Sequence, residues 1–447
     1  MKLTYQVQDK PGFGKTLVFA LQQLLAIMAA TIAVPSIINS NGEIAKLFGV
    51  GTSMSQTAAL FGAGVGTLVY LLFTKFRSPV FLGSSFAFLG SMAAAFTGAV
   101  TMELGYLGLL LGAVFAGLVY VIIALVVKFC GVKWISTLMP PVVIGPTVAI
   151  IGLSLAGNAV GDLGTATAGG SAYVAMICGL VTLAVTMLCS VFGKKMLKMI
   201  PFIIGILAGY IVAAIFTVIG NQTGNAALLV IDFSKFQSIQ WIPDFTFLTA
   251  IKGIKDLTPA YIATVAVAYV PVAFVVFAEH IADHKNLSSI IDTDLLENPG
   301  LHRTLLGDGV GSIAGAIFGG CPNTTYGESV GCVAISGNAS VVTILTTAIL
   351  AIAVSFVGPF ATFLATIPNC VMGGVCIALY GFIAVSGLKM LQSVDLGDNR
   401  NLFTASVILI AGIGGLTVTF GAVTLTSVAC ALILGILTNV MLKGKKN

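Results

Sequence analysis

Long apolar runs alternate with short polar connections along the whole chain. The runs end at glycine, proline or charged residues, and most of them reach the ~20 residues that a helix needs to cross a lipid bilayer. The pattern predicts an all-α polytopic membrane protein with fourteen segments, of which the third and the tenth are too short to cross alone. The predicted segments are 15–38, 54–74, 87–99, 103–128, 138–156, 171–191, 198–219, 258–282, 304–320, 327–337, 340–357, 361–384, 402–418 and 421–442.

Composition supports this class of protein. Hydrophobic residues make up 57% of the 447 residues and charged residues only 8%, whereas about a quarter of the residues of a soluble protein are charged. No long polar block marks a separate soluble domain, so we expect residues 1–447 to form a single membrane domain. The net charge of +5 comes from basic residues scattered singly at the ends of apolar runs, which argues against a nucleic-acid partner.

The distribution of basic residues predicts the orientation of the chain. With a cytoplasmic N-terminus, 17 of the 21 Lys and Arg residues fall in cytoplasmic loops, leaving Lys46, Lys235, Lys252 and Lys255 outside. This distribution follows the positive-inside rule, so we expect both termini to be cytoplasmic. The eight cysteines show no metal-ligand spacing, and we expect neither a metal nor a cofactor.

One stretch, residues 321–328, places a carboxylate and a broken backbone inside an apolar region. Pro322 cannot donate a backbone hydrogen bond, and the residues 324–326 favour extended chain, so a short helix is expected only from Gly327 to Ser336. Extended chain at membrane depth is tolerated where it is buried in protein or lines a cavity. We therefore interpret the stretch as the floor of a binding site containing Glu328. The alternative is that Glu328 only braces the half-helix.

Internal similarity indicates a duplication. With seven predicted segments in each half, an odd number, the second half must insert upside down relative to the first. We expect the two broken stretches, 81–88 and 321–328, to meet near the membrane centre, with Phe86 and Tyr326 in one pocket. The matches are 62–68 with 307–313, Ser84-Ser85-Phe86 with Thr324-Thr325-Tyr326, and Pro140 and Gly145 with Pro368 and Gly373.

The acidic residues predicted in or at the edge of the membrane are functional candidates, because burying an unpaired charge is costly. Glu279 and Asp283 are four residues apart and share one helix face. If Glu279 and Glu328 converge on a dry site from different helices, the pKa of one of them would rise and that group would hold a proton at neutral pH. The candidates are Glu279, Asp283, Asp308 and Glu328.

The two histidines of the same segment form a neighbouring stripe. We interpret His280 as a packed, hydrogen-bonded residue, and no third ligand supports a zinc site. Asp283 and His284 lie at the predicted cytoplasmic end of the segment. Two hypotheses stay open: a proton relay from Glu279 through Asp283 and His284, or a solvated aspartate at a helix end.

Two other classes of function are weaker. The G-x-G-x-G runs lack the strand, helix and acidic residue of a dinucleotide fold, so we interpret them as sites of close helix packing. An intramembrane hydrolase remains the alternative of a different class. However, Leu306 stands where an aspartyl protease would have glycine, and Glu279-His280 reverses the order of a metalloprotease motif. We therefore do not expect an enzyme.

Several motifs together resemble the nucleobase–ascorbate transporter family, and within it the bacterial uracil permeases. The resemblance runs from about residue 15 to residue 440. The stretches that carry it are Ala278-Glu279-His280, Asp294-Leu295-Leu296, residues 298–303, residues 322–328 and residues 81–86.

The resemblance implies a secondary transporter in the inner (plasma) membrane of the cell that takes up a nucleobase, uracil, by proton symport. Xanthine, uric acid or another purine remains an alternative substrate. It also implies two inverted repeats of seven segments, broken at segments 3 and 10, and a homodimer in the lipid bilayer. A core subdomain would comprise about 15–130 and 258–357, and a gate subdomain about 137–220 and 361–442.

The resemblance also implies the site. Two glutamates would bind the base, two backbone N–H groups would meet its carbonyls, and two tyrosines would line the pocket. These residues are, in that order, Glu279 and Glu328, Phe86 and Gly327, and Tyr326 and Tyr380.

This sequence departs from the family pattern at three places. Gln23 and Asp283 stand where the family has histidines, and Ser329 follows the second glutamate where the family commonly has asparagine. These differences bear on the coupling ion and on the fine substrate preference.

Overall fold

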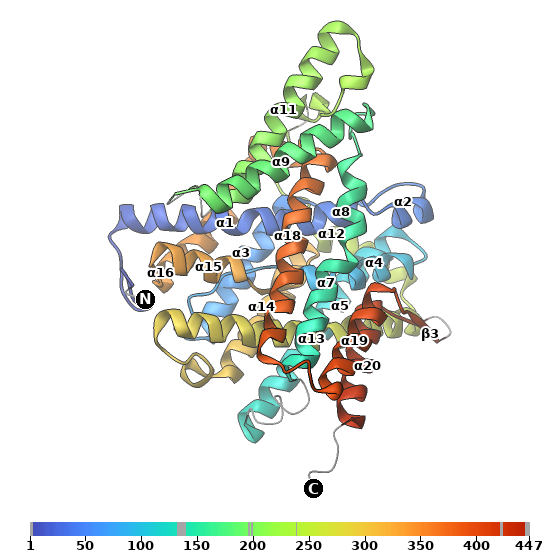
Figure 1. The fold of residues 1–447 in the computed structure, drawn as a ribbon. Coiled ribbons are helices and arrows are strands. Elements are labelled where there is room, and N and C mark those ends of the chain that lie inside the picture. Colours follow the sequence, from blue (N-terminus) through green and yellow to red (C-terminus); the bar gives the residue numbers. More distant parts are fainter. Residues whose placement is uncertain are drawn as a thin grey trace.

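The computed structural model describes residues 3–131, 140–194, 197, 200–237, 239–420 and 423–442. Helices dominate this part of the chain (Figure 1). Some residues used for the orientation, and the first residues of the segments predicted at 138–156, 198–219 and 421–442, lie outside the described residues. The basic residues concerned are Lys2, Lys133, Lys195, Lys198, Lys443, Lys445 and Lys446.

The first half of the chain forms long helices interrupted once by a short strand. Its elements are α1 (Phe13–Asn39), α2 (Gly42–Phe48), α3 (Gln56–Phe73), β1 (Leu82–Ser84), η1 (Phe86–Phe88), α4 (Leu89–Thr97), α5 (Met102–Cys130), α7 (Pro141–Ser154), α8 (Ala156–Leu163), α9 (Ala172–Phe192) and α11 (Pro201–Thr223).

The second half begins with short turns and then repeats the pattern of a strand between helices. Its elements are η2 (Ala226–Leu228), η3 (Phe233–Gln237), α12 (Thr246–Ala250), η4 (Ile251–Asp256), α13 (Pro259–Ile291), η5 (Leu296–Gly300), α14 (Leu301–Gly319), β2 (Asn323–Thr325), α15 (Gly327–Ser336), α16 (Val341–Val354), α17 (Gly358–Thr366), α18 (Asn369–Met390), η6 (Leu391–Ser393), α19 (Asn399–Ile413), β3 (Val418–Phe420), β4 (Val423–Leu425) and α20 (Ser427–Met441).

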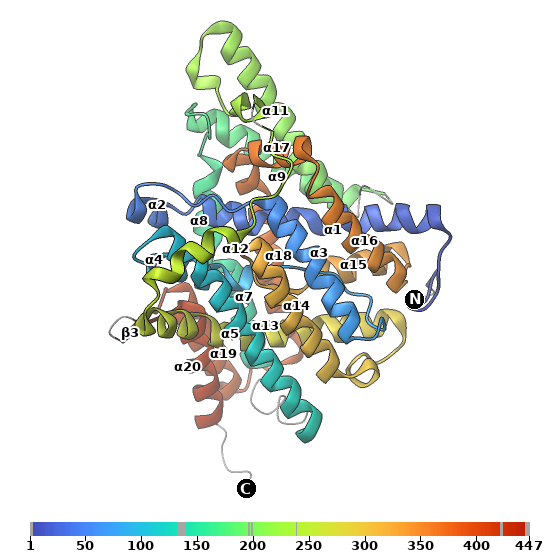
Figure 2. The same ribbon diagram turned by 180° about the vertical axis from the view of Figure 1, so that it is seen from behind.

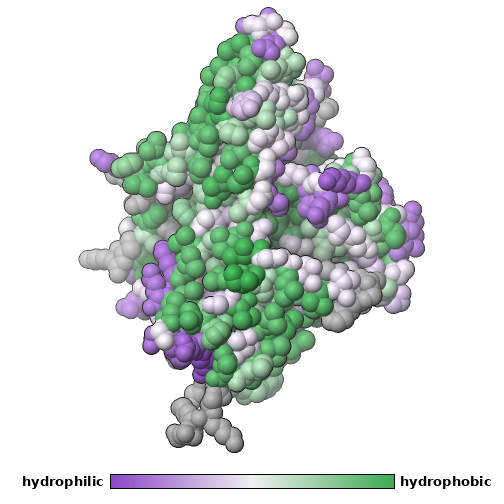
Figure 3. All heavy atoms as spheres, turned by 45° about the vertical axis from the view of Figure 1, so that its right-hand side comes forward, coloured by the Kyte–Doolittle hydropathy of each residue, from purple (hydrophilic) through white to green (hydrophobic). Residues whose placement is uncertain are grey.

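The lengths and apolar composition of these helices are those of a multi-pass membrane protein. Within the described residues, eight helices are long and apolar enough to cross a membrane. The number becomes nine if α16 and α17, bent by 84° at their junction, count as one span. Large apolar side chains are exposed along α9 and α11, and apolar residues cover much of the face seen in Figure 3, as expected of a surface in contact with lipid.

Three predictions about the segments were wrong. α13 continues to Ile291, well past the predicted end at 282, because polar side chains do not interrupt backbone hydrogen bonding; the helix ends where Asp292 turns left-handed (φ 54°). The segment predicted at 361–384 is split into α17 and α18 at the extended residues Ile367 and Pro368, where proline lacks the backbone N–H that a continuous helix would use.

The third correction concerns the all-α prediction. β3 and β4 pair as an antiparallel hairpin, with Val418 opposite Leu425, at the junction of the segments predicted at 402–418 and 421–442. Their Val and Thr residues are apolar or small enough to extend a hydrophobic run, yet they favour strands over helices.

The two broken stretches meet in the middle of the fold, as predicted. β1 pairs antiparallel with β2, placing Leu82 opposite Thr325 and Ser84 opposite Asn323. The N–H of Ser85 extends the ladder by donating to the carbonyl of Pro322 at 2.9 Å. Each strand leads directly into a short helix, η1–α4 or α15, so two half-helices begin at this small sheet.

Glycines let the helices that flank this sheet approach closely. α3 and α14 pack side by side (Figure 2). A Cβ added to Gly62 would lie 2.3 Å from the carbonyl oxygen of Gly315, and one added to Gly66 would lie 2.7 Å from that of Gly311. The interpretation of the G-x-G-x-G runs as packing sites is therefore confirmed.

Candidate functional site

A cavity of about 400 Å³ opens where the two half-helices begin. Its walls come from α1, α7, α11, α13, α18 and the two broken stretches. Most of the lining is apolar, and the polar groups are concentrated on α13 and around the start of α15. The described lining residues include no Lys, Arg or His. The predicted residues that line it are Phe86, Glu279, Asp283, Tyr326, Gly327 and Glu328.

Glu279 on α13 and Glu328 in the first turn of α15 face this cavity from two elements. Both side chains are half-buried. Within the described residues the structure has one ion pair, between His280 and Asp308, so neither glutamate is neutralised by a basic side chain there. Glu328 stands in the first turn of α15, where the helix carries its partial positive charge. The pair therefore offers strong acceptors for N–H donors of a ligand.

The half-helices present backbone donors beside these acceptors. α15 begins at Gly327 after the extended residue Tyr326, and η1 begins at Phe86 after the extended residue Ser85. Neither preceding residue caps its helix with a side-chain hydrogen bond. The first N–H groups of a helix have no partner within the helix, so they suit a carbonyl or an anion.

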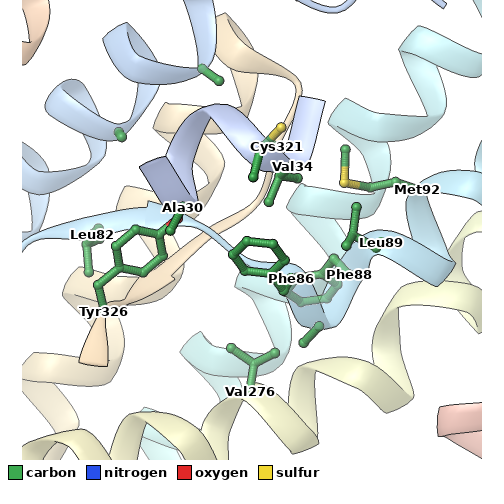
Figure 4. Packing of buried hydrophobic residues seen from close by; sticks show 14 of the residues in the cluster. Ala30, Val34, Leu82, Phe86, Phe88, Leu89, Met92, Val276, Cys321 and Tyr326 are labelled. Carbon is green, nitrogen blue, oxygen red and sulfur yellow. The ribbon is translucent and has the colours of Figure 1, made fainter. Parts of the chain in front are cut away.

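Aromatic side chains bound the site. The hydroxyl of Tyr326 donates to the carbonyl of Ser84 at 2.7 Å, which holds its ring across the β1–β2 sheet. Figure 4 shows Phe86 and Tyr326 in one packed cluster with Ala30 and Val34 of α1. Tyr380 does not line the cavity; its ring packs edge-on against Phe86, with the centroids 6.0 Å apart.

Asp283 is a cavity residue and not part of a solvated helix end. Because α13 continues to Ile291, Asp283 lies inside the helix, one turn beyond Glu279 on the same side. It is half-buried, and its Oδ2 accepts a hydrogen bond from the hydroxyl of Thr325 at 2.9 Å. The alternative of a solvated aspartate at the end of the helix is therefore wrong. Thr325 was not predicted as a site residue, although a polar side chain within the broken stretch was a signal for it.

The two histidines of α13 face the packed interior. His280 Nδ1 lies 2.7 Å from Oδ2 of Asp308, and its Nε2 lies 3.0 Å from the hydroxyl of Thr304. His280 is thus a packed histidine, as predicted. Asp308 belongs to this buried pair and does not line the cavity.

His284 is fully buried and makes a separate set of contacts. Its Nε2 lies 2.7 Å from the hydroxyl of Tyr70 on α3, and its Nδ1 lies 2.8 Å from the carbonyl oxygen of His280. It does not line the cavity, so its side chain points away from the face that carries Asp283. Within the described residues, no group of three His, Cys, Asp or Glu side chains could hold a metal ion.

Comparisons with known proteins agree with a transport site. The model of a family described as "Permease family" matches residues 14–421. The uracil permease of Bacillus caldolyticus is 39% identical over 99% of this chain and 96% of its own length. The uracil permease of Bacillus subtilis is 38% identical over 100% and 96%. The putative pyrimidine permease RutG of Escherichia coli is 30% identical over 98% and 91%.

Solved structures with low sequence identity share the fold. The transmembrane domain of the cyanobacterium bicarbonate transporter BicA superposes with a TM-score of 0.59 at 18% identity, covering 97% of this chain and 100% of that one. The structure of SLC26A9 gives a TM-score of 0.62 at 14% identity, covering 96% and 66%. At these identities the likeness concerns the arrangement of helices alone.

Proposed function

This chain belongs to the permease family whose model matches residues 14–421, and on that premise we propose that it imports uracil across the cell membrane by proton symport. The relatives named uracil permeases cover nearly the whole chain at 35–39% identity. Uracil is a neutral, flat ring with two N–H donors and two carbonyl acceptors. A binding site for it needs buried acceptors, donors and apolar walls together.

The observation that carries the proposal is the juxtaposition of Glu279 and Glu328 on one cavity with the starts of two half-helices. The carboxylates accept the ring N–H groups, and the N–H groups of Phe86 and Gly327 donate to the ring carbonyls. Such pairing is selective because an analogue that lacks a partner leaves a buried polar group unsatisfied.

The aromatic residues complete this proposed site. Tyr326 lies against one side of the bound ring, since it lines the cavity between the two glutamates and β1. In the present conformation Tyr380 packs against Phe86 and influences the bound base through this contact. We propose that Tyr380 contacts the base directly when the gate closes. Flat aromatic contacts favour a planar heterocycle over an aliphatic solute of the same polarity.

We infer proton coupling from the three carboxyl groups of the same site. Glu279, Asp283 and Glu328 share a cavity whose described lining has no cationic side chain. A state in which all three are negatively charged is therefore unfavourable. A proton held by this group while uracil is bound would travel inward with it. We propose that Asp283 takes this proton while Glu279 binds the base. The contacts of His284 with Tyr70 and His280 do not favour its inclusion in the relay.

The proposed architecture is two inverted repeats of seven segments that move by alternating access. The antiparallel pairing of β1 with β2 supports this proposal, because inverted repeats bring equivalent elements together. The core would comprise about 15–130 and 258–357 and the gate about 137–220 and 361–442, in a homodimer with cytoplasmic termini. The repeats would be α1, α3, β1–α4, α5, α7–α8, α9 and α11, followed by α13, α14, β2–α15, α16, α18, α19 and α20.

Uptake of radiolabelled uracil into proteoliposomes tests this function. We expect accumulation when the outside is acidic, and its loss when an ionophore collapses the proton gradient. Unlabelled uracil should compete, whereas xanthine and uric acid should not at equal concentration. Competition by a purine would move the assignment to the purine branch, and accumulation driven by sodium alone would contradict proton symport.

A further inference from the structure

A buried polar contact behind the cavity joins three segments of the chain. Gln23, within the apolar helix α1, is only 3% exposed, and its Nε2 donates to Oγ of Ser329 at 2.5 Å. The same Oγ accepts a hydrogen bond from the backbone N–H of Phe81 at 3.0 Å. One hydroxyl group therefore connects α1, the entry to β1 and the first turn of α15.

This contact adjoins the proposed site without being part of its surface. Neither Gln23 nor Ser329 lines the cavity, whereas Ala26, nearly one turn further along α1, does. Ser329 directly follows Glu328 in the chain. On the other side, Phe81 leads through β1 to Phe86.

The cost of burying an unpaired amide favours one arrangement of α15 relative to α1. An amide buried in an apolar helix is unfavourable unless it is hydrogen-bonded, so Gln23 strongly favours the arrangement in which Ser329 lies opposite it. A hydrogen bond in a low-dielectric interior also resists displacement more than one in water. Rotation or sliding of α15 against α1 would break the contact and move Glu328 with it.

We propose that Gln23 and Ser329 are positioning residues that set the place of the Glu328 carboxylate relative to the Phe86 N–H, and thereby the affinity for the nucleobase. This inference rests on the proposed function. It assigns to two buried residues outside the cavity a role in substrate recognition. A small displacement of a binding group weakens a ligand that must satisfy several hydrogen bonds at once.

A double-mutant cycle on the purified protein tests the proposal. Ser329→Ala and Gln23→Met each remove one partner with little change in volume, and uracil affinity is measured calorimetrically well below the unfolding temperature. We expect each single variant to bind about tenfold more weakly and the double variant to bind no more weakly than the poorer single variant, because both remove one shared contact. Equal affinity in wild type and both single variants, or losses that multiply in the double variant, would overturn it.

A matched control separates positioning from general stability. Ser340→Ala removes another buried hydroxyl, which donates to the carbonyl of Asp9 at 2.6 Å and does not line the cavity. We expect it to lower the unfolding temperature without changing affinity.

If Ser329→Ala fails to fold, Gln23→Met still tests the proposal through hydrogen exchange of the peptide covering residues 78–84. We expect faster exchange with weaker binding; unchanged exchange and affinity would overturn it. Absence of uracil binding by the wild type would instead refute the proposed function.

Discussion

The two sides of α13 carry ionisable residues at the same spacing but in opposite surroundings. Glu279 and Asp283 face the cavity, whereas His280 and His284 are fully buried among the side chains of α3 and α14. Residues four apart share a helix face, but the spacing does not tell which face meets a cavity. The partners from other helices decide this. The cavity side should therefore control binding and coupling, and the packed side should control stability.

The largest expected effect comes from breaking the packed side at Asp308. In Asp308→Ala, His280 Nδ1 loses its partner in a fully buried position. Removing one member of a buried pair costs about 3 kcal/mol or more. We expect a clear fall of the unfolding temperature in detergent, measured by differential scanning fluorimetry. The control is Asp232→Ala, which removes an exposed carboxylate that accepts a hydrogen bond from the hydroxyl of Ser234. It should leave the unfolding temperature unchanged within error.

Substitutions on the cavity side should lower the affinity for uracil and leave the stability nearly unchanged. Glu328→Gln and Glu279→Gln keep the side-chain size but replace a charged acceptor, and a hydrogen bond to a charged group contributes about 1.5–3 kcal/mol. We expect uracil affinity to fall by a factor of about 10 to 100 with little change in unfolding temperature. If instead stability falls and affinity stays, Glu328 only braces its half-helix.

Asp283 should separate coupling from binding on that same side. It accepts a hydrogen bond from the hydroxyl of Thr325 and lines the cavity one helical turn from Glu279. In Asp283→Asn vesicles we expect uracil exchange to continue while accumulation driven by a proton gradient fails. Unchanged uphill uptake would leave coupling to the two glutamates alone.

The smallest expected effect is on the packed side at Tyr70. Tyr70→Phe removes the hydroxyl that contacts both His284 and Ser78, each at 2.7 Å. A neutral hydrogen bond contributes about 1 kcal/mol, so we expect a modest loss of stability and normal transport. The control is Tyr210→Phe, which removes a half-buried hydrogen bond with Thr366 and should lower the stability by less. Impaired proton-driven uptake in Tyr70→Phe would place this histidine face in the coupling path after all.

The local features of the fold were predictable from the sequence because they depend on neighbouring residues. Pro322, the following threonines and Gly327 determine a strand that gives way to a half-helix, and the repeat at 81–88 indicated its partner. The end of α13 was not predictable, since charged residues at the end of an apolar run are compatible with both a loop and a longer helix.

The division of the site between two sides of a helix was not predictable either. The sequence identified Glu279, Asp283, Asp308 and Glu328 as one group of buried acids. Only the contacts of His280 with Asp308 and Thr304 of α14 separate Asp308 from the others. The contact of Gln23 with Ser329 likewise links residues about 300 positions apart, which no local pattern reports.

In the proposed function the two cavity glutamates hold the nucleobase between the half-helices. A structure of the wild-type protein with bound uracil tests this most directly. We expect the ring to lie between Glu279 and Glu328, with its N–H groups within hydrogen-bond distance of the carboxylates and one of its carbonyls accepting from the N–H of Gly327 or Phe86. A uracil molecule bound without contact to either glutamate would contradict it.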